Sequence, residues 1–162
     1  MKDKRVVRFF VSYAHANNKL TKDFIDKFME ISGPAKHFRY ELWHDGMIEV
    51  GEKWEEVIQN AIRECDFGLL LISTAFLGSK YIIDKELPHY FTSDKHAFPV
   101  MLANIDFDRH DLNGLEAHQI YRLNKETFAK PRSYSDCKGQ RREDFVMDLF
   151  AKIDDWLLVH LK

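Results

Sequence analysis

The chain has 162 residues, of which 45% are hydrophobic and 31% charged, and its formal net charge is −2. These values are typical of a single globular domain with one core, and they exclude an intrinsically disordered chain. Because Lys and Arg form no basic run, electrostatics give no reason to expect binding to nucleic acid or to an anionic membrane.

The two cysteines, Cys65 and Cys137, are too few and too far apart for a disulfide framework or a CxxC metal site. Cys65 ends an amphipathic pattern and is predicted to be a buried thiol. No stretch approaches the roughly 20 apolar residues of a membrane span. A reducing, cytoplasmic setting is therefore the default expectation.

The N-terminal stretch MKDKRVVRFFVSYAHA resembles a signal peptide, with a basic start, a short apolar run and an A-x-A sequence at 14–16. Arg8 interrupts the apolar run, and the β-branched and aromatic residues of 6–13 favour a strand instead.

Apolar runs and helical patterns alternate along the rest of the chain. The continuous apolar run 67–73 predicts a central parallel strand that is covered on both faces. The helix from Trp54 to Cys65 repeats apolar residues at helical spacing, and we expect Trp54 to lie in the core. Pro99 places its strand near an edge or a strand start. The expected strands are 6–13, 38–43, 67–73, 97–105 and a short fifth at 118–123; the expected helices cover 20–31, 54–65, 79–91 and 145–156.

This alternation predicts an α/β fold, a flavodoxin-like five-stranded parallel sheet of order 2-1-3-4-5 with helices on both faces. Residues 1–162 are predicted to form one domain. In this sheet order, ligands bind at the carboxyl ends of strands 1 and 3, where the strand order reverses. We therefore expect Ser12, Tyr13 and Ser73 to border a ligand crevice.

The segment SKYIIDKELPHYF, residues 79–91, carries a carboxylate on its apolar side. Glu86 shares a helical face with Ile82, Ile83 and Tyr90. Two explanations are open: the side chain reaches solvent or a lysine, or it has a raised pKa and a chemical role. Pro88 either ends the helix or kinks it near Lys85–Leu87, which would free the carbonyl of Asp84.

Several known chemistries do not fit the sequence. GMIEVGEK (46–53) approaches a phosphate-binding P-loop, but Glu52 stands where that loop has its lysine, and Glu49 adds negative charge. Strand 3 ends in Ser73, where a receiver domain would have an Asp. The histidines show no metal-binding spacing, so no metal is expected. No serine lies in a G-x-S-x-G motif, and we interpret Ser12, Ser73 and Ser79 as cap and turn residues.

Three ordered segments carry a family resemblance. FFVSYAHAN, WHDGMIEVGEKWEEVIQNAI and LLLISTAFLGSKYIIDKEL resemble the signature boxes of a Toll/interleukin-1 receptor (TIR) domain over residues 5–105. The resemblance implies the five-stranded fold predicted above. TIR domains include scaffolds and enzymes that cleave the nicotinamide–ribose bond of NAD+, and the enzymes are common in bacterial antiphage systems.

In the enzymes, a glutamate follows strand 3 in an S-x(n)-E-L setting, and Glu86 matches it. The resemblance implies that Glu86 is catalytic and that Tyr13 and Glu49 lie near the nicotinamide. The enzymes often have Trp four residues before the glutamate, where this chain has Ile82, with Tyr81 as its aromatic neighbour. NAD+ would be a substrate, and no cofactor is implied.

The favoured interpretation is a cytoplasmic TIR enzyme that hydrolyses or cyclises NAD+ when assembled, as a bacterial antiphage effector. The alternative is a non-catalytic TIR scaffold. A nucleoside deoxyribosyltransferase-like enzyme shares the sheet order and a catalytic glutamate but lacks the loop 44–53.

The loop HDGMIEVGEK (44–53, hereafter loop 44–53) has an apolar tip that suits docking on a neighbour: Met47, Ile48, Val50 and Gly51. In the family, this loop packs against the next TIR copy and completes the NAD+ pocket. The resemblance therefore implies head-to-tail self-association, which does not close on two subunits and builds rows. Neither a nucleic acid nor a membrane is an expected partner.

Overall fold

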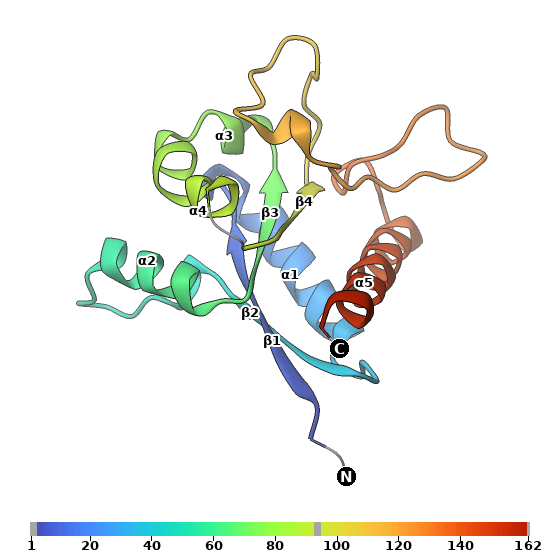
Figure 1. Cartoon of the computed structure of the whole chain (residues 1–162). Helices are drawn as coiled ribbons and strands as arrows, with labels where there is room; N and C mark the ends of the chain where they lie inside the picture. Colours follow the sequence, from blue (N-terminus) through green and yellow to red (C-terminus); the bar gives the residue numbers. More distant parts are fainter. Residues whose placement is uncertain (1–2, 93–94, 162) are drawn as a thin grey trace.

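The computed structural model describes residues 3–92 and 95–161 (Figure 1). Within this part of the chain, the strands form one parallel sheet of order β2-β1-β3-β4. The α/β class and the predicted order of the first four strands are confirmed. The strands are β1 (Arg5–Ser12), β2 (Phe38–Trp43), β3 (Phe67–Ile72) and β4 (Ala97–Met101).

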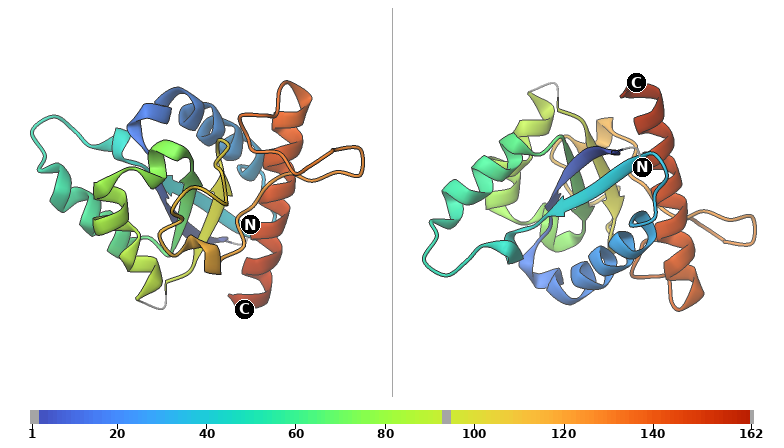
Figure 2. Two further views of the ribbon diagram at one scale, coloured as in Figure 1. Left: turned by 90° about the horizontal axis from the view of Figure 1, so that it is seen from above. Right: turned by 90° about the horizontal axis from the view of Figure 1, so that it is seen from below.

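Helices cover both faces of the sheet (Figure 2). On one face lie α1 (Asn18–Ser32) and α5 (Gln140–His160), which pack against each other. On the other lie α2 (Trp54–Glu64) and the short helices α3 (Thr74–Leu77) and α4 (Pro88–Phe91). The chain thus forms the three layers that were predicted.

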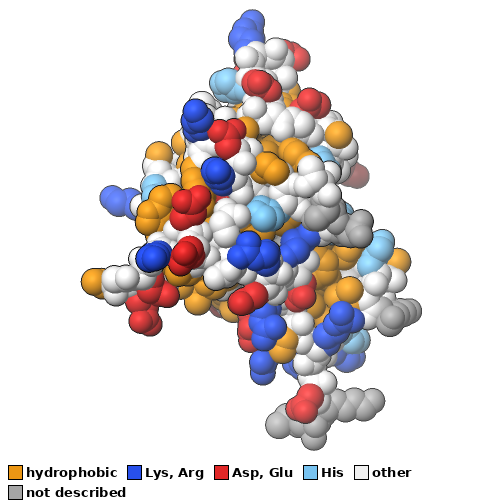
Figure 3. Space-filling view, turned by 60° about the vertical axis from the view of Figure 1, so that its left-hand side comes forward, with side chains coloured by type: hydrophobic (Ala, Val, Ile, Leu, Met, Phe, Trp, Pro, Cys, Tyr) orange, Lys and Arg blue, Asp and Glu red, His pale blue; other side chains and the backbone are white. Residues whose placement is uncertain are grey.

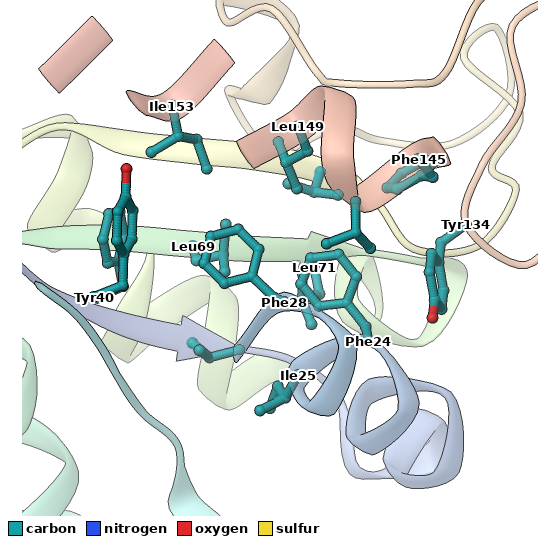
Figure 4. Close-up of a cluster of buried hydrophobic side chains, with 14 of the residues drawn as sticks. Phe24, Ile25, Phe28, Tyr40, Leu69, Leu71, Tyr134, Phe145, Leu149 and Ile153 are labelled. Carbon is teal, nitrogen blue, oxygen red and sulfur yellow. The ribbon is translucent and has the colours of Figure 1, made fainter. Parts of the chain in front are cut away.

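Each face of the sheet has its own hydrophobic cluster because successive strand residues point to opposite faces. Phe9, Leu69 and Leu71 face α1 and α5, where aromatic rings fill much of the space (Figure 4). Phe10 and Leu70 face α2, α3 and α4. This burial on both faces explains the continuous apolar run that predicted β3.

The predicted fifth strand at 118–123 is not present as a strand. Tyr121 forms a single parallel bridge with Val100: its N–H donates to Pro99 O at 2.8 Å and its carbonyl accepts from Met101 N at 2.9 Å. Pro99 has no N–H to extend this ladder backward. Extension forward is blocked because Met101 O already accepts from Tyr134 N at 2.9 Å.

A close contact between α4 and β3 seats the segment that carries Glu86. At Gly68, an added Cβ would lie 2.5 Å from Cζ of Tyr90. Only glycine allows the Tyr90 ring to lie this close to the strand. This contact fixes the depth at which the helical segment 79–91 packs on the sheet.

Among residues 3–92 and 95–161, no helix combines the length and apolar character needed to cross a membrane. Cys65 and Cys137 are both buried free thiols, as predicted for Cys65.

Candidate functional site

The expected helix 79–91 is divided in two. A π-helix covers Ile82–Glu86, and α4 begins at Pro88. Leu87 N donates to Ile82 O at 2.9 Å, five residues back, and Pro88 has no N–H to donate to Asp84 O. Of the two alternatives left open for Pro88, the structure shows the helix restarting near Lys85–Leu87, and the wider turn leaves both Ile82 and Glu86 buried.

Glu86 is an almost fully buried carboxylate, 6% exposed. Its Oε1 accepts a hydrogen bond of 2.5 Å from Ser12 Oγ, at the end of β1. No Lys or Arg of the described residues pairs with it. The pKa of Glu86 is raised to about 7, chiefly because burial removes its hydration. The Ser12 hydrogen bond and the His15 charge lower this pKa, whereas the charge of Asp45 raises it further. The alternative of a solvent-exposed or lysine-paired carboxylate is therefore wrong.

Asp45 joins the site although no sequence motif singled it out. Tyr13 Oη donates to Asp45 Oδ1 at 2.7 Å, and His15 Nε2 pairs with Asp45 Oδ2. Asp45 lies just after β2, which runs parallel to β1 with Trp43 opposite Phe10. The carboxyl ends of the two strands therefore bring these side chains together, a signal that the predicted sheet order already contained.

A cavity of about 410 Å³ opens beside this cluster. Glu86 is not among its lining residues, but its partner Ser12 directly precedes the lining residue Tyr13, and the charge of the lining residue Asp45 acts on it. The prediction that Trp54 is core is wrong: it is 54% exposed, lines the cavity and has its ring 5.0 Å from that of Tyr81. The lining residues are Tyr13, His15, Asn18, Asp45, Gly46, Ile48, Trp54 and Ile58.

Of the remaining residues predicted to border the crevice, one is half-buried and two are buried. Tyr81 is half-buried, accepts from Gln59 Nε2 at 3.3 Å, and has its pKa raised by burial and by the charge of Glu86. Ile82 is 3% exposed and packs in the core, which leaves no surface for a ligand in this conformation. Ser73 is buried; it donates to Asn17 Oδ1 at 2.6 Å and accepts from Phe76 N at 3.0 Å, as a cap of α3.

Loop 44–53 projects beside α2 with an apolar tip and an acidic stem. Met47 is 52% exposed and Val50 fully exposed, whereas Ile48, expected at the exposed tip, is half-buried against the core. Glu49 is exposed, and its N–H donates to Glu52 Oε1 at 2.7 Å. On this side of the molecule, hydrophobic side chains stand among acidic ones (Figure 3).

Gly51 adopts φ +91° in loop 44–53, in the left-handed region that favours glycine.

Within the described ranges 3–92 and 95–161, no group of three or more His, Cys, Asp or Glu side chains is arranged to hold a metal ion.

Comparison with known proteins places these features in a family. A family model described as TIR domain matches residues 9–135, which include every site residue above. The chain is a TIR domain. The TIR match covers the end of β1, loop 44–53 and the segment around Glu86, in the order in which the three signature boxes were found.

The chain also resembles an uncharacterized protein, y4lF, from Sinorhizobium fredii (strain NBRC 101917 / NGR234). The two are 30% identical over 112 residues, which are 67% of this chain and 34% of that protein. The chain therefore spans about a third of the length of this relative.

Proposed function

We propose that this TIR domain is an NAD+ nucleosidase in which Glu86 stabilises the transition state for loss of nicotinamide. The observation that carries the proposal is a single buried carboxylate beside the carboxyl end of β1, without a basic partner among the described residues. Burying a charge without a basic partner is costly, and such groups cluster at functional sites.

The chemistry requires only one carboxylate. When the bond between nicotinamide and ribose breaks, nicotinamide leaves as a neutral molecule and the ribosyl carbon becomes oxocarbenium-like. No general acid is needed for the leaving group. An anion near the ribosyl carbon, or bonded to the ribose hydroxyls, stabilises the positive charge that develops. Water or a hydroxyl of the substrate then attacks, giving ADP-ribose or a cyclic product.

The pKa of about 7 suits this role because both forms of Glu86 are populated near neutral pH. The pyridinium ring of NAD+ is positively charged, and an opposite charge nearby favours the carboxylate. Ligand entry would therefore ionise Glu86 at the moment its charge is required. Ser12, which already donates to Oε1, holds that oxygen in place.

Assembly is part of the proposal because Glu86 is covered in the single chain. Its 6% exposure leaves no room for a ribose in contact with it, and the neighbouring cavity ends before it. TIR domains generally self-associate, and Met47 and Val50 offer an exposed apolar contact on loop 44–53. We infer that head-to-tail packing of copies moves this loop, uncovers Glu86 and completes the pocket.

The burial of Glu86 in the single chain also supports a second candidate function, a non-catalytic scaffold. In a scaffold, Glu86 would remain bonded to Ser12, and Ile82 would remain in the core instead of offering the aromatic surface of the enzymes. Loop 44–53 would then serve only to recruit other TIR domains.

Incubation of the concentrated pure protein with NAD+, followed by chromatography, separates the two candidates. The enzyme releases nicotinamide together with ADP-ribose or a cyclic isomer, at a rate that rises more steeply than the protein concentration. A scaffold releases none at any concentration that gives assemblies by light scattering. For the cellular role, an antiphage effector, we expect NAD+ to fall in infected cells that carry the intact gene and to persist with Glu86→Gln.

A further inference from the structure

The hydroxyl group of Tyr13 has its only proton committed to Asp45. The distance from Oη to Asp45 Oδ1 is 2.7 Å, and a carboxylate can only accept. The second oxygen of Asp45 is occupied by His15 Nε2, so the carboxylate is held from both sides. Burial, and then the bond to Asp45 and its charge, raise the pKa of Tyr13 far above its ordinary value, so the phenol keeps this proton.

A hydroxyl that has donated its proton offers a ligand only lone pairs. Tyr13 and Asp45 both line the 410 Å³ cavity, so a molecule bound there meets the Tyr13 oxygen as an acceptor. The Asp45 carboxylate, which lines the same cavity, adds a negative charge there. His15, which lines the same cavity, has its Nε2 engaged by Asp45.

We propose that the Tyr13–Asp45 pair is a specificity device that selects a pyridine ring bearing a carboxamide over one bearing a carboxylate. A carboxamide brings N–H donors to the Tyr13 oxygen. A carboxylate brings only acceptors and a negative charge, so it meets the Tyr13 lone pair and the Asp45 carboxylate. The inference rests on the proposed function, and it takes the nicotinamide end of NAD+ to enter the cavity that Tyr13 lines, as the TIR resemblance implies.

His15 is the group that could reverse this preference. If the His15 ring left Asp45, its N–H could donate to a ligand carboxylate, and the site would then accept the acid as well as the amide. The bond between His15 and Asp45 is therefore part of the device, and Asp45 acts on the ligand by positioning both neighbours.

The test compares NAD+ with the analogue in which nicotinic acid replaces nicotinamide. We expect kcat/KM to favour NAD+ by about tenfold or more, since a site built around one hydrogen bond rejects the analogue that lacks it. Tyr13→Phe removes the acceptor and should bring the two substrates within about threefold of each other. In Asp45→Asn, the side-chain amide can itself donate to Tyr13 Oη, which leaves the Tyr13 proton free to face the ligand. This variant should give a substrate ratio between those of wild type and Tyr13→Phe.

Tyr40→Phe is the matched control. Tyr40 Oη donates to Asp154 Oδ1, also at 2.7 Å, but it packs on the face of the sheet covered by α1 and α5. Its removal should leave the substrate ratio unchanged.

Binding of the two dinucleotides to the Glu86→Gln protein, measured by saturation-transfer NMR, separates this inference from the proposed function. Preferential binding of NAD+ that Tyr13→Phe abolishes supports the specificity device even if no cleavage is seen. Equal binding, preference for the acid, or binding of neither dinucleotide overturns it, whether or not the protein cleaves NAD+.

Discussion

Ser12 Oγ donates a 2.5 Å hydrogen bond to Glu86 Oε1 across 74 positions of sequence, joining the end of the central strand β1 to the π-helix. This bond lowers the pKa of Glu86 and so opposes the effect of burial. Ser12 therefore increases the fraction of Glu86 that is ionised at a given pH.

Ser12→Ala should raise the pKa of Glu86 above about 7, because the stabilising hydrogen bond is lost and the burial remains. Activity at pH 7 should fall, and the acid limb of the pH–rate profile should move to higher pH. Ser73→Ala is the control, since Ser73 is equally buried but bonds Asn17 and Phe76. A loss of activity that is the same at every pH would contradict this role of Ser12.

Glu86 should also make the protein less stable as pH rises. Its folded pKa of about 7 lies above the ordinary value of 4.5, so the folded state binds the proton more tightly than the unfolded state. The penalty is absent below pH 4.5 and grows as pH rises to about 7, to at most roughly 3 kcal/mol.

Glu86→Gln removes this penalty. Melting temperatures of the two proteins should be similar near pH 4.5, and the variant should melt higher at pH 8. A difference in melting temperature that does not change between these pH values would show that Glu86 ionises as freely as in the unfolded chain.

Much of the fold could be predicted because its causes are local. Apolar runs marked β1 to β4, and Pro88 marked the break in the helix around Glu86. The fifth strand could not be predicted because its pairing depends on a distant competitor: Tyr134 takes the carbonyl of Met101 that Leu123 would need. Helical spacing alone placed Trp54 in the core, whereas its position in the first turn of α2 leaves it 54% exposed.

The candidate site was likewise predicted in part. Glu86, Ser12 and Tyr13 followed from the signature boxes and from the strand ends. The predicted sheet order places Asp45, just after β2, beside the end of β1, but its side-chain bond to Tyr13 and its pairing with His15 follow from no spacing rule.

Trp54→Ala should leave stability within about 0.5 kcal/mol of wild type, as for other surface substitutions. It should weaken NAD+ cleavage, because the ring lines the cavity and packs on Tyr81. Phe76→Ala, at a fully buried position, should cost about 3–5 kcal/mol by the same thermal or urea unfolding measurement. Comparable losses of stability for the two variants would place Trp54 in the core after all.

Gly51→Pro should abolish concentration-dependent activity while the monomer stays folded. Proline fixes φ near −65°, which is incompatible with the +91° of Gly51, so loop 44–53 must change shape. Gly139→Ala is the control, because Gly139 also has a positive φ and open space around it but lies outside loop 44–53. Sedimentation velocity and circular dichroism check assembly and folding.

Mixing Gly51→Pro with Glu86→Gln tests whether the pocket is shared between copies. One variant supplies the glutamate and the other an intact loop, so partial activity should return on mixing. Activity proportional to concentration in wild type, with no recovery on mixing, would show that each chain holds a complete site.

The most direct measurement is nicotinamide release by Glu86→Gln, compared with wild type and with Glu56→Gln on the exposed side of α2. The variant keeps the shape of the side chain and removes the anion. Cleavage by Glu86→Gln should fall by about two to four orders of magnitude, the usual loss for a catalytic electrostatic group, while Glu56→Gln stays near wild type. Near-normal nicotinamide release by Glu86→Gln would contradict the assignment of catalysis to this carboxylate.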